Sequence, residues 1–246
     1  MIPFYEGDYY MQGFFRMLSK RGVESIALCL LIFTVISYMA QESFLPEALM
    51  PVSASASPVV ILDAGHGGTD GGTQGVGGTL EKDLNLRYAL GLGELLSLFG
   101  YRVIQSRTED SLVLKEGEDI YGMRKRCDLK NRKDLMRQYT DAVFLSIHMN
   151  AFPVAKYKGL QVYYAQNQES RRLAEGIQGI VKAHLQQDNE RLPKAADESL
   201  YLLDGVKTPA VLVECGFLSN EEDEKNLLDE SYQKRLCFLL LCAIMK

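Results

Sequence analysis

Two of the three histidines in the 246-residue chain follow runs of residues that are typical of buried strands. His66 lies in DAGHGG, directly after the apolar run at 59–63, and His148 lies in SIHMNA, at the end of the run at 142–148. Active sites of open α/β sheets collect at the carboxyl ends of the strands. If these two strands are neighbours, both imidazoles face one crevice, and both are candidate metal ligands.

Two glutamates also lie near the ends of predicted strands or in the loops that follow them. Glu81 ends a glycine-rich loop that begins at Gly65, and Glu214 follows a short apolar run and opens ECGFLSN. Two histidines, one glutamate and an open fourth position are the ligand set of a catalytic zinc. This set is spread over separate elements, unlike an HExxH helix, so its spacing alone is a weak indication. Taken singly, each of these residues is more often structural, as a hydrogen-bonded histidine or a glutamate at a helix N-terminus.

The composition excludes several other classes of protein. Hydrophobic residues make up 47% and charged residues 24% of the chain, which is typical of a globular protein. The net charge is −5 and there is no strong basic block, which argues against nucleic acid as a partner. The five cysteines form no CxxC pair, so they indicate neither a disulfide framework nor a thiolate zinc site. The glycine loop matches neither the dinucleotide-binding nor the P-loop pattern.

Strands and helices that must position these residues alternate along the chain. Periodicity and turn residues predict strands at 59–63, 101–106, 142–148, 159–165, 200–203 and 211–214, and helices at 84–99, 119–139, 169–185 and 232–245. This alternation predicts a single-domain α/β fold, a three-layer sandwich in which a mixed sheet has helices on both faces.

The N-terminal part has a different character. Residues 25–41 are uncharged and mostly apolar, and basic residues precede them, which predicts a cytoplasmic segment at 1–24 and export of the chain beyond residue 41. The apolar run predicts an N-terminal hydrophobic helix, either an uncleaved transmembrane anchor, which we favour, or a cleaved signal. Residues 42–57 have the composition of a linker, and the catalytic domain is expected at 58–246. The domain is therefore expected outside the cytoplasm, anchored to the membrane, or secreted if the segment is cleaved.

Four segments, in the same order along the chain, resemble the zinc-dependent N-acetylmuramoyl-L-alanine amidases: DAGHGG, LEKDLNL, SIHMNA and VECGFLSN. The resemblance extends from residue 59 to the last residue. It implies an α/β sandwich and one Zn²⁺ bound by His66, Glu81 and His148, with Glu214 as the catalytic carboxylate. It also implies that the substrate is peptidoglycan, cleaved between N-acetylmuramic acid and L-alanine.

Within that family, the sequence is most similar to the germination-specific type. The hydrophobic N-terminal segment, the lack of wall-binding repeats and the DLKNR sequence at Asp128–Arg132 carry this similarity. It implies a role in maturation of the spore cortex, with muramic-lactam formation, and a location in the spore envelope. A general cell-wall autolysin of the same family is the alternative. Some members need an activator protein, and the sequence leaves this need and the oligomeric state open.

The resemblance suggests roles for further residues. Glu214 is expected to accept a proton from water and to deliver it to the departing amine. Asp63 is a candidate for orienting His66, although a turn or helix-capping role is equally compatible. The loop glycines are expected to let a bulky glycan approach the backbone. The basic residues of the helix near 124–137 could attract an acidic stem peptide, but we favour a solvated helix face.

Two other functions remain as alternatives. Cys215 follows a strand and precedes a glycine, so a cysteine-dependent amidase with Glu214 nearby is conceivable. This interpretation leaves His66 and His148 without a role. A catalytically inactive wall-binding or regulatory module is a second alternative, and the presence of the whole set of site residues argues against it.

Overall fold

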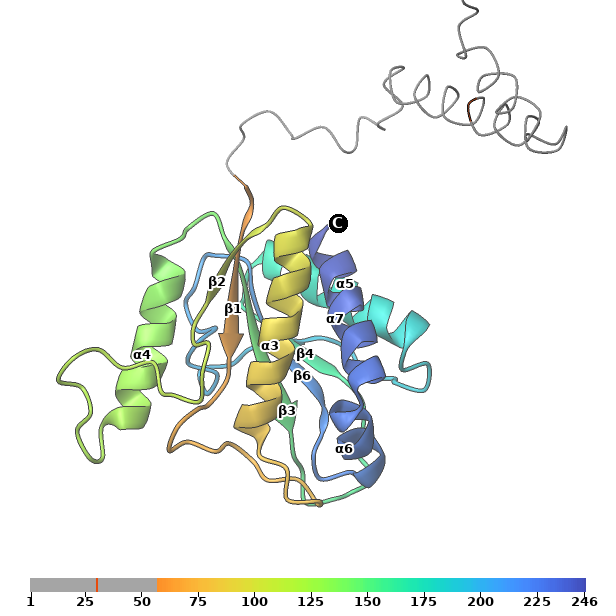
Figure 1. The fold of residues 1–246 in the computed structure, drawn as a ribbon, viewed down its shortest axis with the longest axis horizontal. Coiled ribbons are helices and arrows are strands. Elements are labelled where there is room, and N and C mark those ends of the chain that lie inside the picture. The colour runs from red at the N-terminus through yellow and green to blue at the C-terminus, as the bar shows by residue number, and fades with distance from the viewer. Residues whose placement is uncertain (1–29, 31–56) are drawn as a thin grey trace, which may run out of the picture. The chain divides into compact units, whose positions relative to one another are not determined.

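The computed structural model describes Leu30 and residues 57–246 of the chain (Figure 1). The segments expected at 1–24, 25–41 and 42–57 lie outside the described residues, apart from Leu30 and Ser57. Among the described residues, no helix combines the length and the hydropathy that crossing a bilayer requires.

The centre of the described fold is a six-stranded mixed sheet with the order β2-β1-β3-β6-β4-β5. Its strands are β1 (Val59–Ala64), β2 (Arg102–Gln105), β3 (Val143–Asn150), β4 (Gln161–Tyr164), β5 (Lys194–Ala195) and β6 (Ala210–Phe217). Adjacent strands among β2, β1, β3 and β6 are parallel to each other, whereas β4 pairs with β6 in the antiparallel sense. The edge strand β5 is parallel to β4. The predicted α/β class with a mixed sheet is confirmed.

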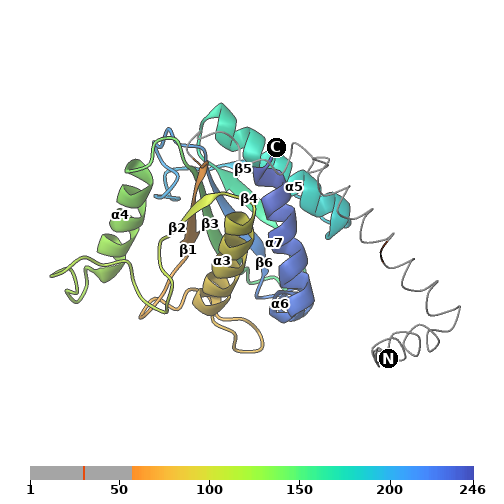
Figure 2. The same ribbon diagram turned by 45° about the horizontal axis from the view of Figure 1, so that its top comes forward.

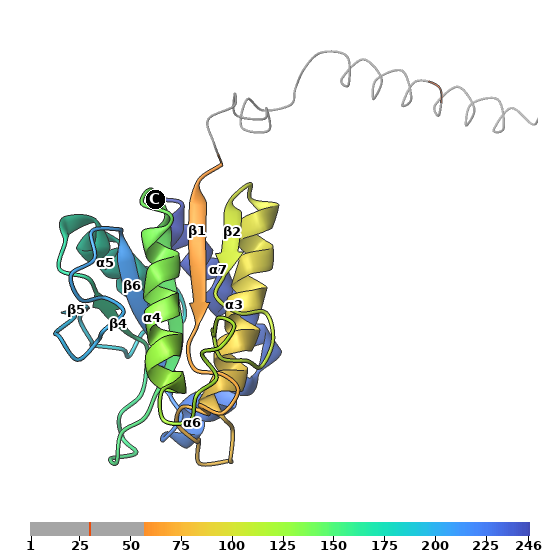
Figure 3. The ribbon, with the colours of Figure 1, turned by 90° about the vertical axis from the view of Figure 1, so that its left-hand side faces the viewer.

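Helices pack against this sheet. They are α3 (Glu81–Leu98), α4 (Arg124–Arg137), α5 (Gln168–His184), α6 (Glu221–Leu228) and α7 (Glu230–Ile244). Figure 1 shows α4 to the left of β1 and β2 and shows α3 and α7 to the right of these two strands, and in Figure 3 α4 comes to the front. Figure 2 shows α5 beside α7, in agreement with the contacts between these two helices.

The first strand shows why the sheet is buried on both faces. Val60 and Leu62 belong to the larger core, which includes side chains of α3 and α7. Ile61, between them, belongs to a second core together with Phe144 and with Met136 of α4. Successive side chains of a strand point to opposite faces, so an uninterrupted apolar run such as VVIL is what a strand covered on both sides requires.

After β4, two parts of the secondary structure differ from the prediction. The run at 200–203 forms turns and is not a strand, and β5 lies a few residues earlier. Leu202 and Leu203 are nevertheless buried, which explains their apolar character. Helix α6 was missed, although Asn220 accepts a hydrogen bond from the backbone N–H of Asp223 and acidic residues fill the first turn. That pattern is a recognisable helix start.

Helix α4 begins five residues later than predicted, at Arg124. Gly122 has a φ of +82°, in the left-handed region, so the chain there cannot belong to the helix. The residues before it instead form a loop that is joined to α4, because Val113 donates its backbone N–H to Asp128.

Candidate metal centre

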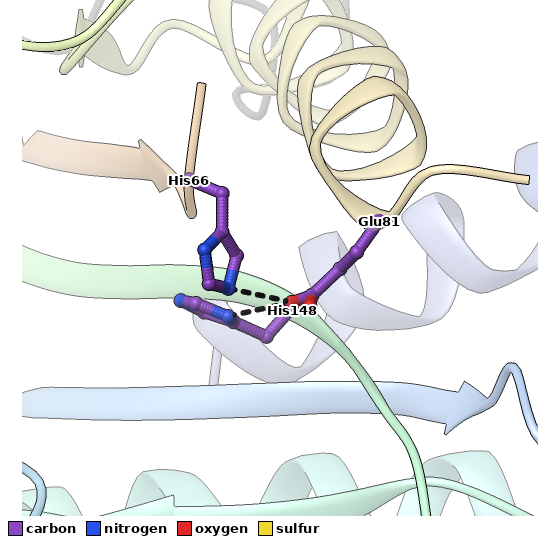
Figure 4. Close-up of side chains that lie close together, drawn as sticks. All are labelled: His66, Glu81 and His148. Carbon is purple, nitrogen blue, oxygen red and sulfur yellow. Dashed lines mark hydrogen bonds and ion pairs between the residues drawn. The ribbon is translucent and has the colours of Figure 1, made fainter. Parts of the chain in front are cut away.

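The neighbouring parallel strands β1, β3 and β6 have their carboxyl ends at one edge of the sheet, and the candidate ligands gather there. His66 comes two residues after β1, Glu81 is the first residue of α3, and His148 lies in β3. One ligand atom of each residue lies within 4.8 Å of those of the other two. Figure 4 shows the two imidazole rings and the carboxylate pointing toward one another. The structure therefore brings together the three residues that the sequence singled out.

Glu81 is the centre of this cluster. Its Oε1 lies 3.2 Å from Nε2 of His66 and 2.9 Å from Nδ1 of His148. Its Oε2 accepts a hydrogen bond from the backbone N–H of Thr73 (2.8 Å), which fixes the plane of the carboxylate. Burial alone would raise the pKa of Glu81, but its hydrogen bonds to His148 and His66 hold the pKa well below its usual range. The carboxylate is therefore ionised at neutral pH.

Two glycines allow the close packing of the three side chains. A Cβ atom at Gly65 would lie 2.2 Å from the ring of His148, and one at Gly72 would lie 2.5 Å from Oε2 of Glu81. At these two positions the missing side chain leaves room for the candidate ligands themselves. The expectation that the loop glycines let a bulky glycan approach the backbone stays a prediction.

The ring of His66 contacts Glu81 through Nε2 and a second carboxylate through Nδ1. This second carboxylate is Asp70 and not the expected Asp63. Oδ2 of Asp70 lies 3.0 Å from Nδ1 of His66, and its Oδ1 accepts a hydrogen bond from the backbone N–H of Gly72. Burial lowers the pKa of His66, but its close contacts with the carboxylates of Glu81 and Asp70 outweigh burial and raise the pKa. Sequence reasoning missed Asp70, although its position four residues after His66, behind two glycines, was a usable signal.

Asp63 has a different position from the one expected. It is fully buried, and its carboxylate accepts hydrogen bonds from Nη1 of Arg132 (2.6 Å) and from Oγ of Ser146 (2.6 Å). Burial raises its pKa, but the charge of Arg132 and the hydrogen bonds outweigh this and lower it. Its link to His66 runs through Arg132, which donates a hydrogen bond to the backbone carbonyl of His66.

Glu214 lies on β6 directly beside His148 of β3, as its partner in the parallel register. The two side chains are therefore on the same face of the sheet. Oε2 of Glu214 is buried and has no hydrogen-bond partner among the described residues. Burial raises the pKa of Glu214 to about 7, although the nearby charge of His148 opposes the shift. A carboxyl group that titrates near neutrality is suited to proton transfer in both directions.

Cys215 is on the other face of β6. It is fully buried in the larger core, close to Cys237, and burial raises the pKa of its thiol well above the usual range. A cysteine nucleophile needs a thiolate that the substrate can reach. The structure therefore does not support a cysteine-dependent reaction.

The basic helix α4 is not a fully solvated face. Arg132 and Lys133 are buried, and Nζ of Lys133 donates hydrogen bonds to the carbonyls of Tyr201 and Asp204 (2.8 Å each). Lys125 is exposed and lies 3.2 Å from Asp70. The preference for a solvated face is wrong for Arg132 and Lys133, because these two cations hold neighbouring loops through backbone carbonyls.

Comparison with known proteins identifies this arrangement. A model of the N-acetylmuramoyl-L-alanine amidase family matches residues 60–245. The chain belongs to this family. Members of the family cleave the amide bond between N-acetylmuramic acid and L-alanine in peptidoglycan, so this chain is an enzyme that acts on the cell wall, outside the cytoplasm. The alternative of an inactive wall-binding module is not supported.

Individual relatives of this amidase agree with the family assignment. The germination-specific N-acetylmuramoyl-L-alanine amidase of Bacillus subtilis (strain 168) is 33% identical over 206 residues, which are 83% of this chain and 84% of the relative. The CwlD amidase of Clostridioides difficile, solved in complex with the GerS lipoprotein, is 39% identical with a TM-score of 0.73, over 77% of this chain and 97% of that one. AmiC2 of Nostoc punctiforme is 27% identical with a TM-score of 0.64, over 76% and 95%.

Proposed function

We propose that this amidase uses one zinc ion bound by His66, Glu81 and His148, with Glu214 as the catalytic carboxylate. The observation that carries the proposal is the convergence of two imidazole nitrogens and a carboxylate oxygen within 4.8 Å. This donor set, with a position left open, is typical of catalytic zinc. Metal ligands must be deprotonated, and Glu81 is ionised at neutral pH.

In the proposed reaction, water attacks the lactyl carbonyl carbon and the bond to the L-alanine nitrogen breaks. Bound zinc supplies a Lewis acid that polarises the carbonyl and lowers the pKa of water toward ~7. Glu214 accepts the proton that the water loses and then donates it to the departing amine. Burial keeps the proton affinity of Glu214 high enough for both steps. Asp70 restrains the ring of His66 from the side opposite to Glu81.

The test uses the full-length protein purified in detergent. Its metal content is measured, and purified peptidoglycan is digested before chelation, after chelation and after zinc is restored. We expect about one zinc per chain, new L-alanine amino termini, loss of activity with chelator and recovery with zinc. Full activity in metal-free protein would refute the zinc assignment.

For the biological role, we propose that the enzyme acts on the spore cortex, where removal of stem peptides allows muramic lactam to form. The similarity to a germination-specific amidase supports this setting. A general autolysin of growing cells is the alternative. Deletion of the gene in its host should give spores that lack muramic lactam and germinate poorly, with normal vegetative growth. Normal cortex composition together with defective cell separation would favour the autolysin.

We also propose that residues 25–41 anchor the enzyme to the outer face of the membrane and that residues 42–57 link this anchor to the catalytic domain at 58–246. The basic residues before the apolar run support this orientation. Alkaline extraction of membranes should leave the full-length chain in the pellet. A soluble chain with a new N-terminus between residues 41 and 57 would show that the segment is a cleaved signal.

A protein activator is a further part of this proposal. The related CwlD amidase was solved in complex with the GerS lipoprotein. We propose that this amidase likewise has a protein partner outside the cytoplasm. Activity of the purified enzyme on cortex fragments should rise when membrane extract from sporulating host cells is added, and protease treatment of the extract should abolish the increase. Equal activity with and without extract would argue against an activator.

A further inference from the structure

The backbone that carries His66 is held by two buried arginines. As the chain leaves β1, Nε of Arg107 donates to the carbonyl of Ala64 (2.9 Å) and its Nη2 donates to the carbonyl of Gly65 (3.0 Å). Arg132 donates from Nη1 to Ala64 (2.7 Å) and from Nη2 to His66 (2.7 Å). Three successive carbonyls are thus bound by two guanidinium groups.

His66 needs such support because its backbone is in an unusual conformation. Its φ is +60°, in the left-handed region, and it is the only described residue other than glycine with a positive φ. A residue with a side chain keeps this conformation only where its surroundings impose it. The hydrogen bonds that Arg107 and Arg132 donate to the carbonyls of Ala64, Gly65 and His66 supply that restraint.

Arg107, unlike Arg132, also contacts the first turn of α3. Its Nη2 also donates to the backbone carbonyl of Lys82 (2.8 Å), the residue after Glu81 in the first turn of α3. One guanidinium group therefore connects the turn of His66 to the turn of Glu81, while its Nη1 binds the carbonyl of Glu109. Arg107 is therefore one of the side chains that hold the two candidate ligands at a defined distance.

The charges around the two arginines differ. Arg132 forms ion pairs with Asp63 (2.6 Å) and Asp128 (2.8 Å), so its charge is balanced. Arg107 is buried, at 5% exposure, and forms no ion pair within the described residues. A buried cation without a carboxylate partner is a poor way to stabilise a fold. Its multiple donors in a fixed plane, however, suit it for holding several carbonyls at defined positions.

We propose that Arg107 is a positioning residue that sets the separation of His66 and Glu81 and thereby the affinity for zinc. This inference rests on the proposed zinc ligation. Asn85 forms a second bridge, from its Nδ2 to the carbonyl of Gly65 (3.1 Å) and to Oε1 of Glu81 (3.2 Å), but it contacts a ligand atom directly. Arg107 forms no hydrogen bond with either ligand side chain, so its replacement tests positioning.

The experiment compares R107K and R107M with R87M in the full-length protein purified in detergent. Arg87 is a matched control, because its guanidinium also binds a backbone carbonyl, that of Leu227, but connects α3 to α6 away from the site. The dissociation constant for zinc is measured by competition with a chelator. Thermal unfolding of the zinc-free protein and the visible spectrum of the Co²⁺ form are measured in parallel.

We expect R107M and R107K to weaken zinc binding by about 10- to 100-fold, the usual effect of removing a group that orients a metal ligand. R107K retains the positive charge but cannot span the same carbonyls, so a loss in this variant is due to geometry and not to charge. The Co²⁺ spectrum should change in both Arg107 variants. R87M should lower the melting temperature but leave zinc affinity and spectrum unchanged.

Several outcomes would overturn the inference. Wild-type zinc affinity in R107M or in R107K would show that Arg107 does not position the ligands. If neither variant folds while R87M does, Arg107 is a folding residue and the inference fails. A wild-type protein that binds no zinc would refute the proposed ligation itself, and this result is distinct because it needs no variant.

Discussion

At the scale of single residues, the two glutamates of the site have opposite electrostatic environments. Glu81 is surrounded by imidazole nitrogens that lower its pKa, whereas burial raises the pKa of Glu214 to about 7. A permanently ionised carboxylate suits a metal ligand, and one that titrates near neutrality suits a proton carrier. The two roles can therefore be separated by the same chemical substitution at each position.

We predict that Glu214→Gln retains zinc but lowers kcat by about 10² to 10⁴, because the amide cannot accept the proton of water. Glu81→Gln should instead release zinc, since a neutral amide is a poor replacement for the charged oxygen. Metal content and release of L-alanine amino termini are measured side by side for both variants. Equal zinc loss in the two would mean that the roles are interchanged or shared.

A second prediction concerns the glycine next to His66. Gly65→Ala places a Cβ 2.2 Å from the ring of His148, so the ring or the turn must move, and zinc affinity should fall at least tenfold. Gly71→Ala is the matched control, because its Cβ meets only Cδ2 of Leu80, at an ordinary 3.7 Å. Chelator competition measures both affinities. Unchanged affinity in Gly65→Ala would show that the site tolerates movement of the ring.

At the scale of helices and strands, a buried ion pair connects α4 to β1. Arg132 of α4 reaches across the second core to Asp63 of β1, and both side chains are buried. Removal of Asp63 would leave Arg132 with Asp128 as its remaining carboxylate partner, and loss of one partner of a buried ion pair is strongly destabilising. Arg132 also binds the backbone carbonyl of His66. Protonation of Asp63 would therefore weaken the attachment of α4 to β1 and to the turn of His66.

This coupling predicts an acid-dependent loss of stability. The pKa of Asp63 is lower in the folded protein than in the unfolded chain, so its contribution to stability is complete above the unfolded pKa of about 3.9 and is lost as the pH falls through the folded value. We expect Asp63→Asn to lower the free energy of unfolding by about 3 kcal/mol at pH 7 and by less in acid. Denaturant unfolding between pH 7 and pH 3 measures this difference.

The control for this prediction is Asp141→Asn, at an exposed position before β3. Surface substitutions of this kind change stability by about 0.5 kcal/mol or less at any pH. A difference between wild type and Asp63→Asn that stayed constant down to pH 3 would mean that the ion pair is not the source of the effect.

At the scale of the whole molecule, the proposed zinc connects elements that are distant in the sequence. His66 follows β1, Glu81 begins α3 and His148 lies in β3, so zinc that binds only the folded chain should stabilise the entire fold. At a free concentration of 100 times the dissociation constant, the gain is about 2.7 kcal/mol. We therefore predict that the melting temperature rises by several degrees with zinc.

The same measurement on His148→Ala tests where the ion binds. This variant lacks one of three ligands, so zinc should no longer raise its melting temperature. A rise equal to that of the wild type would place the stabilising ion elsewhere in the protein. Magnesium at the same concentration serves as a control, because an oxygen-preferring ion gains little from two imidazoles.

Local patterns in the sequence were sufficient for a large part of this description. The apolar run before His66 and the run that ends at His148 predicted two strands, because strands buried on both faces need uninterrupted apolar residues. The four-part resemblance pointed to His66, Glu81 and His148, which the structure brings together. Helix α6 shows a local signal, the capping Asn220, that was present and overlooked.

Only the tertiary structure decided which polar groups meet. Asp63 and Asp70 are similar in the sequence, yet Asp70 approaches the ring of His66 while Asp63 points into the sheet toward Arg132. Glu214 and Cys215 are adjacent, but the alternation of β6 sends one to the site and the other into the core. Arg107 binds carbonyls on two separate elements, and no local pattern encodes such a contact, because it depends on the three-dimensional path of both chain segments.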